Sequence, residues 1–168
     1  WLYKHVWNES RINNKLTDDS PRISMPRIRV NEILPFTNKQ IYDLVVDVES
    51  YPKFLPWCTK TRVWDRQEKQ FMAELTVSFK GIREKFQTLD VIEPHSKVEI
   101  NLKSGPFQYL ASTWQFHPIG EDRTQVEFFI DFRFSNKMKE MIMGPVFTQV
   151  SKQMISAFRK RAITLYRR

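Results

Sequence analysis

Several features that define familiar classes of protein are missing from this sequence of 168 residues. Cysteine occurs once, at Cys58, so no internal disulfide is possible. No run of about 18 apolar residues is present, so we expect no helix that spans a membrane. The three histidines and Cys58 do not have the spacing of metal ligands, so no metal site is predicted.

Sequence motifs of catalysis are also missing. The chain has no nucleophile elbow and no phosphate-binding loop. Asp65, Glu84 and Asp90 lie on predicted strands and are candidates to face an interior cavity, yet none has an evident partner. We therefore predict that the protein is not an enzyme and has no resident cofactor.

The sequence is rich in aromatic and basic residues. Thirteen Phe and five Trp exceed the needs of a modest core, which favours a large apolar interior or a cavity. The formal net charge is +8, with a pI of about 9.7. Such a charge favours an anionic partner, either nucleic acid or a membrane with acidic lipids, and says nothing about the fold.

The chain length indicates one folded domain, predicted over residues 26–168, behind an N-terminal segment. Residues 1–25 carry scattered Lys and Arg and few apolar clusters, so we predict a basic arm or linker there. Two interpretations stay open: the remnant of an organelle-targeting presequence, or a disordered arm. Glu9, Asp18 and Asp19 weaken the first.

Periodicity predicts the elements of the domain. An alternating strand over 27–34 precedes a helix over 38–49, capped by Thr37. Strands follow over 59–66, 70–80, 83–92, 97–103, 109–117 and 124–135, and their short connections indicate an antiparallel meander. A long helix is predicted over 136–166, kinked or split at Gly144-Pro145. Its apolar stripe is Met138, Met141, Ile142, Val146, Val150, Met154, Phe158, Ala162 and Leu165.

These elements predict an α+β fold. A twisted antiparallel sheet with one apolar face must be covered, and the C-terminal helix is the one element long enough. We therefore expect a curved sheet of about seven strands wrapped around this helix, with an apolar cavity between them.

The segment Tyr51-Pro-Lys-Phe-Leu-Pro-Trp-Cys58 joins the first helix to the sheet. Its two prolines hold apolar side chains on a stiff turn. Such a turn is either a lid on the core or the lip of an apolar pocket. Cys58 is predicted to be a small buried hydrophobe rather than a reactive thiol.

Three stretches resemble a known family. They are Asp47-Val-Glu-Ser-Tyr-Pro-Lys-Phe-Leu-Pro-Trp-Cys58, Gly105-Pro-Phe107 followed by Trp114, and Gln153-Met-Ile-Ser-Ala-Phe-Arg-Lys-Arg-Ala162. Together with the order of elements, they are similar to the mitochondrial coenzyme Q-binding protein family, within the START-like, helix-grip (polyketide cyclase-like) superfamily. The resemblance covers roughly residues 27–168. The sequence departs from the family at Gly144-Pro145.

The resemblance implies a protein that binds ubiquinone, or a polyprenyl-quinone intermediate, as cargo. It implies a lipid chaperone for respiratory electron transport and coenzyme Q biosynthesis, with contacts to quinone-biosynthesis enzymes. It also implies a peripheral position on the matrix side of the mitochondrial inner membrane.

Two sets of candidate site residues result. The predicted ligand-binding residues are Phe54, Leu55, Pro56, Trp57, Phe79, Phe107, Trp114, Phe128, Phe132, Met143, Phe147, Met154 and Phe158. The sheet aromatics and the methionines among them suit core packing as well as a cavity wall. The predicted contacts with acidic lipids are Lys152, Arg159, Lys160, Arg167 and Arg168.

Two other functions remain open. The bacterial relatives of the family suggest a factor that binds the large, here mitochondrial, ribosomal subunit, and the basic surface would suit RNA phosphates. An enzyme of the aromatase/cyclase type would need polar groups along the cavity, and the apolar strand faces argue against it.

Overall fold

Alternating apolar and polar residues form seven strands. Two short helices connect the first strand to the second, and two longer helices follow the last strand. The computed structural model describes residues 27–167, so the arm predicted for residues 1–25 lies outside the described residues. The elements are β1 (Arg27–Leu34), α2 (Asn38–Val46), the 3-10 helix η2 (Val48–Lys53), β2 (Cys58–Trp64), β3 (Gln70–Phe79), β4 (Ile82–Glu93), β5 (Lys97–Ser104), β6 (Phe107–Ile119), β7 (Arg123–Phe134), α3 (Lys137–Lys152) and α4 (Met154–Tyr166).

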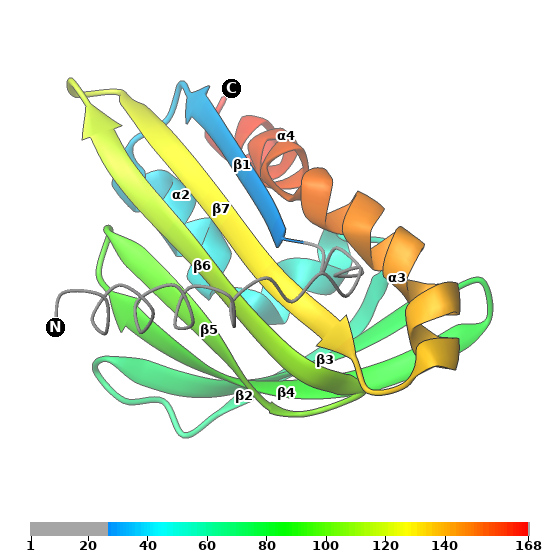
Figure 1. Ribbon diagram of the computed structural model, residues 1–168. Coiled ribbons are helices and arrows are strands. Elements are labelled where there is room, and N and C mark those ends of the chain that lie inside the picture. Colours follow the sequence, from blue (N-terminus) through cyan, green and yellow to red (C-terminus); the bar gives the residue numbers. More distant parts are fainter. Residues whose placement is uncertain (1–26, 168) are drawn as a thin grey trace, which may run out of the picture.

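The strands form one antiparallel sheet in the order β1-β7-β6-β5-β4-β3-β2. Strands β2 to β7 follow each other as a meander, and β1 pairs with β7, where Val30 lies opposite Phe128. Figure 1 shows how strongly the sheet curves and how α3 and α4 run along its open side. The predicted α+β helix-grip architecture is thus confirmed.

The inner face of the sheet is apolar. On β7 every second side chain is buried, from Val126 to Phe134, and none of these five is more than 5% exposed. Burying a side chain of this size contributes roughly 1.5–3 kcal/mol. The alternation that predicted this strand therefore also fixes which of its faces meets the helices.

Helix α2 begins as predicted and ends earlier. Thr37 and Gln40 form a capping box at its N-terminus. The helix ends at Val46 rather than Glu49, and the chain tightens into η2, which contains Pro52. Proline has no N–H to continue an α-helical ladder. The Tyr51 hydroxyl donates to the Val45 carbonyl, which would otherwise lack a partner at the helix end.

The long C-terminal helix breaks at Gln153, not at Gly144-Pro145 as predicted. Helix α3 runs through Pro145 to Lys152, and α4 begins at Met154. The Ser151 hydroxyl donates to the Phe147 carbonyl over 2.7 Å. This side-chain bond competes with the backbone ladder and bends helices. The break thus lies next to Ser151, eight residues beyond the proline.

The predicted apolar stripe is wrong at both ends of this helical region. Met138, Met141 and Ile142 are 71%, 78% and 51% exposed, and Leu165 is 46% exposed. The buried face of α3 consists of Met143, Gly144, Phe147 and Ser151. This orientation buries Met143 and Phe147, and it is accompanied by polar contacts: Glu140 accepts from the backbone N–H of Phe134 (2.8 Å), and Lys139 pairs with Glu84 (3.1 Å).

Gly105 lies in the turn between β5 and β6 with φ +143°, and a Cβ there would lie 2.5 Å from the Cβ of Phe86. Gly105→Ala should therefore lower the free energy of unfolding by about 2 kcal/mol or more, through backbone strain and overpacking. Gly120→Ala is the matched control, since its φ is +65° and nothing lies within 4 Å of its Cβ position. Urea denaturation measures both; equal losses would show that the contact with Phe86 does not constrain position 105.

Candidate functional site

A cavity of about 80 Å³ lies between the inner face of the sheet and the helices. Its wall is mostly apolar, with side chains from η2, from β3 to β7 and from both C-terminal helices. The lining residues are Val48, Tyr51, Trp57, Leu75, Phe86, Thr88, Asp90, Ile100, Leu110, Ser112, Trp114, Phe128, Ile130, Phe147, Val150, Ser151, Met154 and Phe158.

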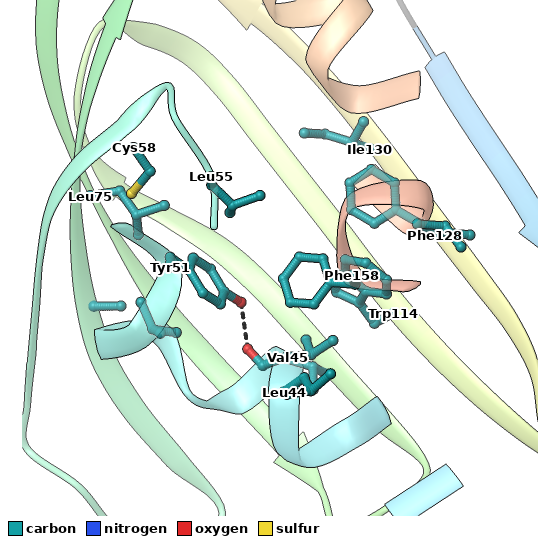
Figure 2. Close-up of a cluster of buried hydrophobic side chains, with 14 of the residues drawn as sticks. Leu44, Val45, Tyr51, Leu55, Cys58, Leu75, Trp114, Phe128, Ile130 and Phe158 are labelled. Carbon is teal, nitrogen blue, oxygen red and sulfur yellow. Dashed lines mark hydrogen bonds between the residues drawn. The ribbon is translucent and has the colours of Figure 1, made fainter. Parts of the chain in front are cut away.

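Phe158 of α4 is at the centre of the aromatic packing around this cavity. Its ring centroid lies 5.4 Å from that of Tyr51, 5.1 Å from that of Phe54 and 5.0 Å from that of Trp114, in edge-on arrangements. Figure 2 shows Phe158 between Tyr51 and Trp114, with Phe128 beside Trp114. Edge-to-face contacts are the favoured geometry for aromatic rings, so these residues form a rigid wall.

A groove of about 570 Å³ lies outside the cavity, between the 53–57 segment and the helices. Trp57, Val150 and Met154 line both the cavity and the groove, and we call these three residues the neck. Lys53, Lys160 and Arg161 give the groove its positive charge, and Phe54, Leu55 and Pro56 give it apolar surface. The groove is therefore suited to an amphiphilic molecule.

The predicted lip and the predicted cavity wall meet at this site. Trp57, Trp114, Phe128, Phe147, Met154 and Phe158 line the cavity. Phe54, Leu55 and Pro56 line the groove. These nine predicted ligand-binding residues come from the 54–57 segment, from β6 and β7 and from both C-terminal helices, and they line two adjacent spaces.

Four predicted ligand-binding residues line neither the cavity nor the groove. Phe107 and Phe132 pack with Phe134 and Phe147 in an aromatic cluster that reaches the cavity through Phe147 and Phe86. Met143 is 3% exposed in the core, and Phe79 stacks on Trp57 with centroids 6.3 Å apart. The pattern predicted that these side chains point to the inside of the fold. It did not predict how far the cavity extends along each strand and helix.

The basic residues predicted to contact lipid differ in their surroundings. Lys152 and Lys160 are exposed, and Arg167 lies over the Phe36 ring with its guanidinium carbon 5.2 Å from the centroid. Arg159 is half-buried and forms an ion pair with Glu32 of β1, so it is held against the sheet. Arg168 lies outside the described residues.

The sequence named Asp90 as a candidate to face the cavity, but it did not identify Thr88 and Ser112, two other polar groups of the cavity wall. Asp90 is 4% exposed, and its carboxylate accepts a hydrogen bond of 2.7 Å from the Thr88 hydroxyl. Burial raises the pKa of Asp90 to about 7, and the Thr88 bond opposes this shift. The signal in the sequence was the presence of Thr88 and Asp90 in the same alternating set as the buried Phe86.

Asp65 and Glu84, the other two candidate acids, do not reach the cavity. Asp65 is exposed in the bend after β2, where its φ is +51°. Glu84 forms its ion pair with Lys139. Asp90 is therefore the one of the three that faces the interior.

Cys58 and Tyr51 lie behind the lip and do not ionise near neutral pH. Burial raises the pKa of the Cys58 thiol to about 11, and it raises that of the Tyr51 phenol well above its ordinary value. Cys58 is 2% exposed. The prediction of a buried, unreactive thiol is thus confirmed.

The cavity is small for a ring-shaped ligand. Its 80 Å³ is about half of the roughly 150 Å³ of an engineered protein cavity that accepts benzene. A ligand with a substituted ring therefore has to widen it. The neck is suited to this, because Met154 is flexible and directly follows the helix break at Gln153.

Residues 27–167 hold no helix long and apolar enough to cross a membrane. The same residues contain no group of three or more His, Cys, Asp and Glu side chains placed to hold a metal ion.

The fold agrees with comparisons to known proteins. A family described as polyketide cyclase/dehydrase and lipid transport matches residues 34–159, and the chain belongs to this family. A START superfamily protein from Mycobacterium smegmatis has the same fold, with a TM-score of 0.71 and 17% identity over 83% of this chain and 98% of that one.

Two named groups of relatives are similar in sequence. The ribosome association toxin RatA of Escherichia coli is 38% identical over 144 residues, covering 86% of this chain and 91% of that protein. The mitochondrial coenzyme Q-binding protein COQ10 homolog B of Xenopus laevis is 31% identical over 155 residues, covering 89% of this chain and 64% of that protein. The family level of the resemblance is thus confirmed, and relatives carry both names.

The raised pKa of Asp90 predicts how stability depends on pH. The folded state holds the Asp90 proton up to about pH 7, whereas an unfolded Asp releases it near pH 4. Stability should therefore fall as the pH rises from about 4 through 7, by an amount on the order of 4 kcal/mol. Asp90→Asn should remove this loss, so that the variant gains on the wild type between pH 5 and pH 8.

Urea denaturation at the two pH values measures this difference. Glu99→Gln, on the partly exposed outer side of β5, is the control for loss of a carboxylate and should follow the wild type. If wild type and Asp90→Asn change in parallel between pH 5 and pH 8, the Asp90 carboxyl is already ionised at pH 5.

Proposed function

We propose that this protein binds ubiquinone or a polyprenyl-quinone intermediate and carries it as a lipid chaperone. The observation that carries the proposal is an apolar cavity next to a partly apolar, partly basic groove, with Trp57, Val150 and Met154 lining both. A quinone ring would occupy the cavity after widening it at the neck, and an isoprenoid tail suits the neck and the groove. The family's association with lipid transport and the similarity to a coenzyme Q-binding protein support it.

The mechanism is sequestration without a chemical step. Removing an isoprenoid tail from water yields about 25 cal/mol per Å² of apolar surface. The bilayer offers the same gain, so a carrier has to bind its cargo about as well as the membrane does. A cavity that opens at the neck satisfies this condition, because the cost of opening offsets part of the gain from burial.

The proposed site of action is the matrix side of the mitochondrial inner membrane, as a peripheral protein. Lys152 and Lys160 lie on the exposed side of the helices, and Lys160 also lines the groove. Acidic headgroups bound there would place the neck at the lipid surface. Quinone-biosynthesis enzymes are then the expected neighbours that deliver or receive the cargo.

The first experiment is organic extraction of the purified protein, followed by mass spectrometry. A stoichiometric polyprenyl quinone would support the carrier function and give the tail length. A protein that is empty, and stays empty after incubation with quinone-loaded vesicles, would contradict it.

A second function is favoured by one specific observation, the similarity to RatA over nearly the whole length of that protein. The +8 charge of the chain would suit ribosomal RNA as well as acidic lipids. Sedimentation with large ribosomal subunits at physiological salt tests this function. Co-sedimentation of a protein without lipid would favour ribosome association over the carrier.

The neck should control entry to the cavity. Val150→Trp places a large ring between groove and cavity, so we expect at least a several-fold decrease in quinone loading from vesicles. Val146→Trp is the matched control: it lies one turn earlier on α3, is also half-buried and lines neither space. Equal loading of the two variants, with equal unfolding midpoints, would contradict this route.

Binding to membranes should depend on the lysines beside the groove. Reversing the charge of Lys152 and Lys160 to Glu should weaken flotation with cardiolipin vesicles at least about tenfold, since each basic residue near an acidic surface contributes roughly 1 kcal/mol. Lys69→Glu with Lys103→Glu changes the net charge equally at exposed sites on the sheet side. Equal flotation with neutral vesicles would exclude the electrostatic contribution.

A further inference from the structure

A buried carboxyl group in the cavity wall is not used by sequestration alone. Asp90 belongs to β4, and among the described residues Thr88 is the one hydrogen-bond donor recorded for its side chain. A carboxylate accepts up to four hydrogen bonds, and an apolar environment penalises each one that is missing. The Asp90 carboxyl can therefore form further hydrogen bonds with a polar group that enters the cavity.

The sheet register places a second polar group on the same wall. Asp90 lies opposite Ile100 on β5, and Ile100 lies opposite Ser112 on β6. Asp90 and Ser112 thus share a face, two strand spacings or about 9.5 Å apart. The Ser112 hydroxyl donates to the Phe129 carbonyl over 2.9 Å, so its oxygen offers lone pairs toward the cavity. The two polar groups thus lie on either side of Ile100 in an otherwise apolar wall.

We propose that Asp90, oriented by Thr88, binds the headgroup oxygen of the cargo and distinguishes a quinone carbonyl from a phenolic hydroxyl. This inference rests on the proposed carrier function. A protonated carboxyl donates a hydrogen bond to a carbonyl oxygen, which can only accept. An ionised carboxylate can only accept, so it suits a phenol or hydroquinone.

The surroundings of Asp90 leave it as the group that changes state near neutral pH. Phe71 and Ile100 flank it on β3 and β5, and both are apolar. Tyr51 of η2 approaches from the lip, and it keeps its proton because burial raises its pKa. Burial raises the pKa of Asp90 to about 7, so the carboxyl changes from hydrogen-bond donor to acceptor near neutral pH.

The consequence is a selectivity that depends on pH. Quinone binding requires the proton on Asp90, so affinity should fall as the pH rises above about 7, by up to about tenfold per pH unit. Binding of a phenol with the same tail should not fall in this interval. Inserting a quinone also excludes water from the carboxyl, which favours its protonated form further.

The test uses the full chain and a ubiquinone with two isoprenoid units, with the corresponding phenol as second probe. Trp57 and Trp114 line the cavity, so quenching of their fluorescence reports binding. In the wild type the dissociation constant for the quinone should rise several-fold from pH 6 to pH 8. Asp90→Asn should bind the quinone equally at both pH values, because its amide always donates, and Glu99→Gln should follow the wild type.

Thr88→Val provides a second readout. Without the Thr88 hydroxyl, the carboxyl of Asp90 loses the bond that favours its ionised form, so the midpoint of the pH profile should move upward. A purely structural role of Thr88 would change stability and leave the midpoint in place.

The outcomes separate this inference from the function on which it rests. If the wild type binds quinone and Asp90→Asn shows the same dependence on pH, headgroup recognition by Asp90 is excluded and the carrier function stands. If the wild type binds neither probe at pH 6 or pH 8, the carrier function and the inference are both excluded.

Discussion

The packing of the Phe158 ring against Tyr51, Phe54 and Trp114 is the interaction on which the rest of the site depends. It joins α4, the lip segment and the centre of the sheet through one side chain that is 1% exposed. Large rings in edge-on contact hold their elements apart at a fixed distance, because they cannot interdigitate as aliphatic side chains do. The cavity lies beside this contact, so the same rings that stabilise the fold also prevent the helices from closing fully on the sheet.

The sequence predicted most of the fold because burial on one face gives a period of two. The inner residues of β7 alternate without exception, so its bounds and its face were both predictable. On β4 the sequence does not show which face is buried, because Leu89 and Val91 alternate with Thr88 and Asp90. In the structure the polar pair is buried. Tertiary packing decided this face. In α3, the helix buries Met143 and Phe147 rather than the predicted stripe, an orientation that also allows the contacts of Glu140 and Lys139.

The lip segment shows why part of the site was recognisable and part was not. Two interpretations were open for it, a lid on the core or the edge of a pocket. In the structure, some of its side chains cover the core and others border the groove. Cys58 is buried in the core, Phe54 and Trp57 are half-buried and border the groove, and Leu55 is buried and also lines the groove. Prolines predict the stiffness of such a turn. They do not predict which of its side chains point inward, because a 3-10 turn has no long period to read.

Positive charge alone does not distinguish a lipid surface from RNA, and the interior provides a second, independent observation. A protein that acts through its surface gains nothing from a void, and an interior filled with apolar side chains would stabilise it more. Asp90 adds a cost above about pH 7, where its carboxyl must ionise within an apolar wall. The cavity and the acid are both unfavourable for stability, and they occupy the same place in the fold. This coincidence is what a binding site requires, and it favours a small amphiphilic ligand with a polar head as the occupant.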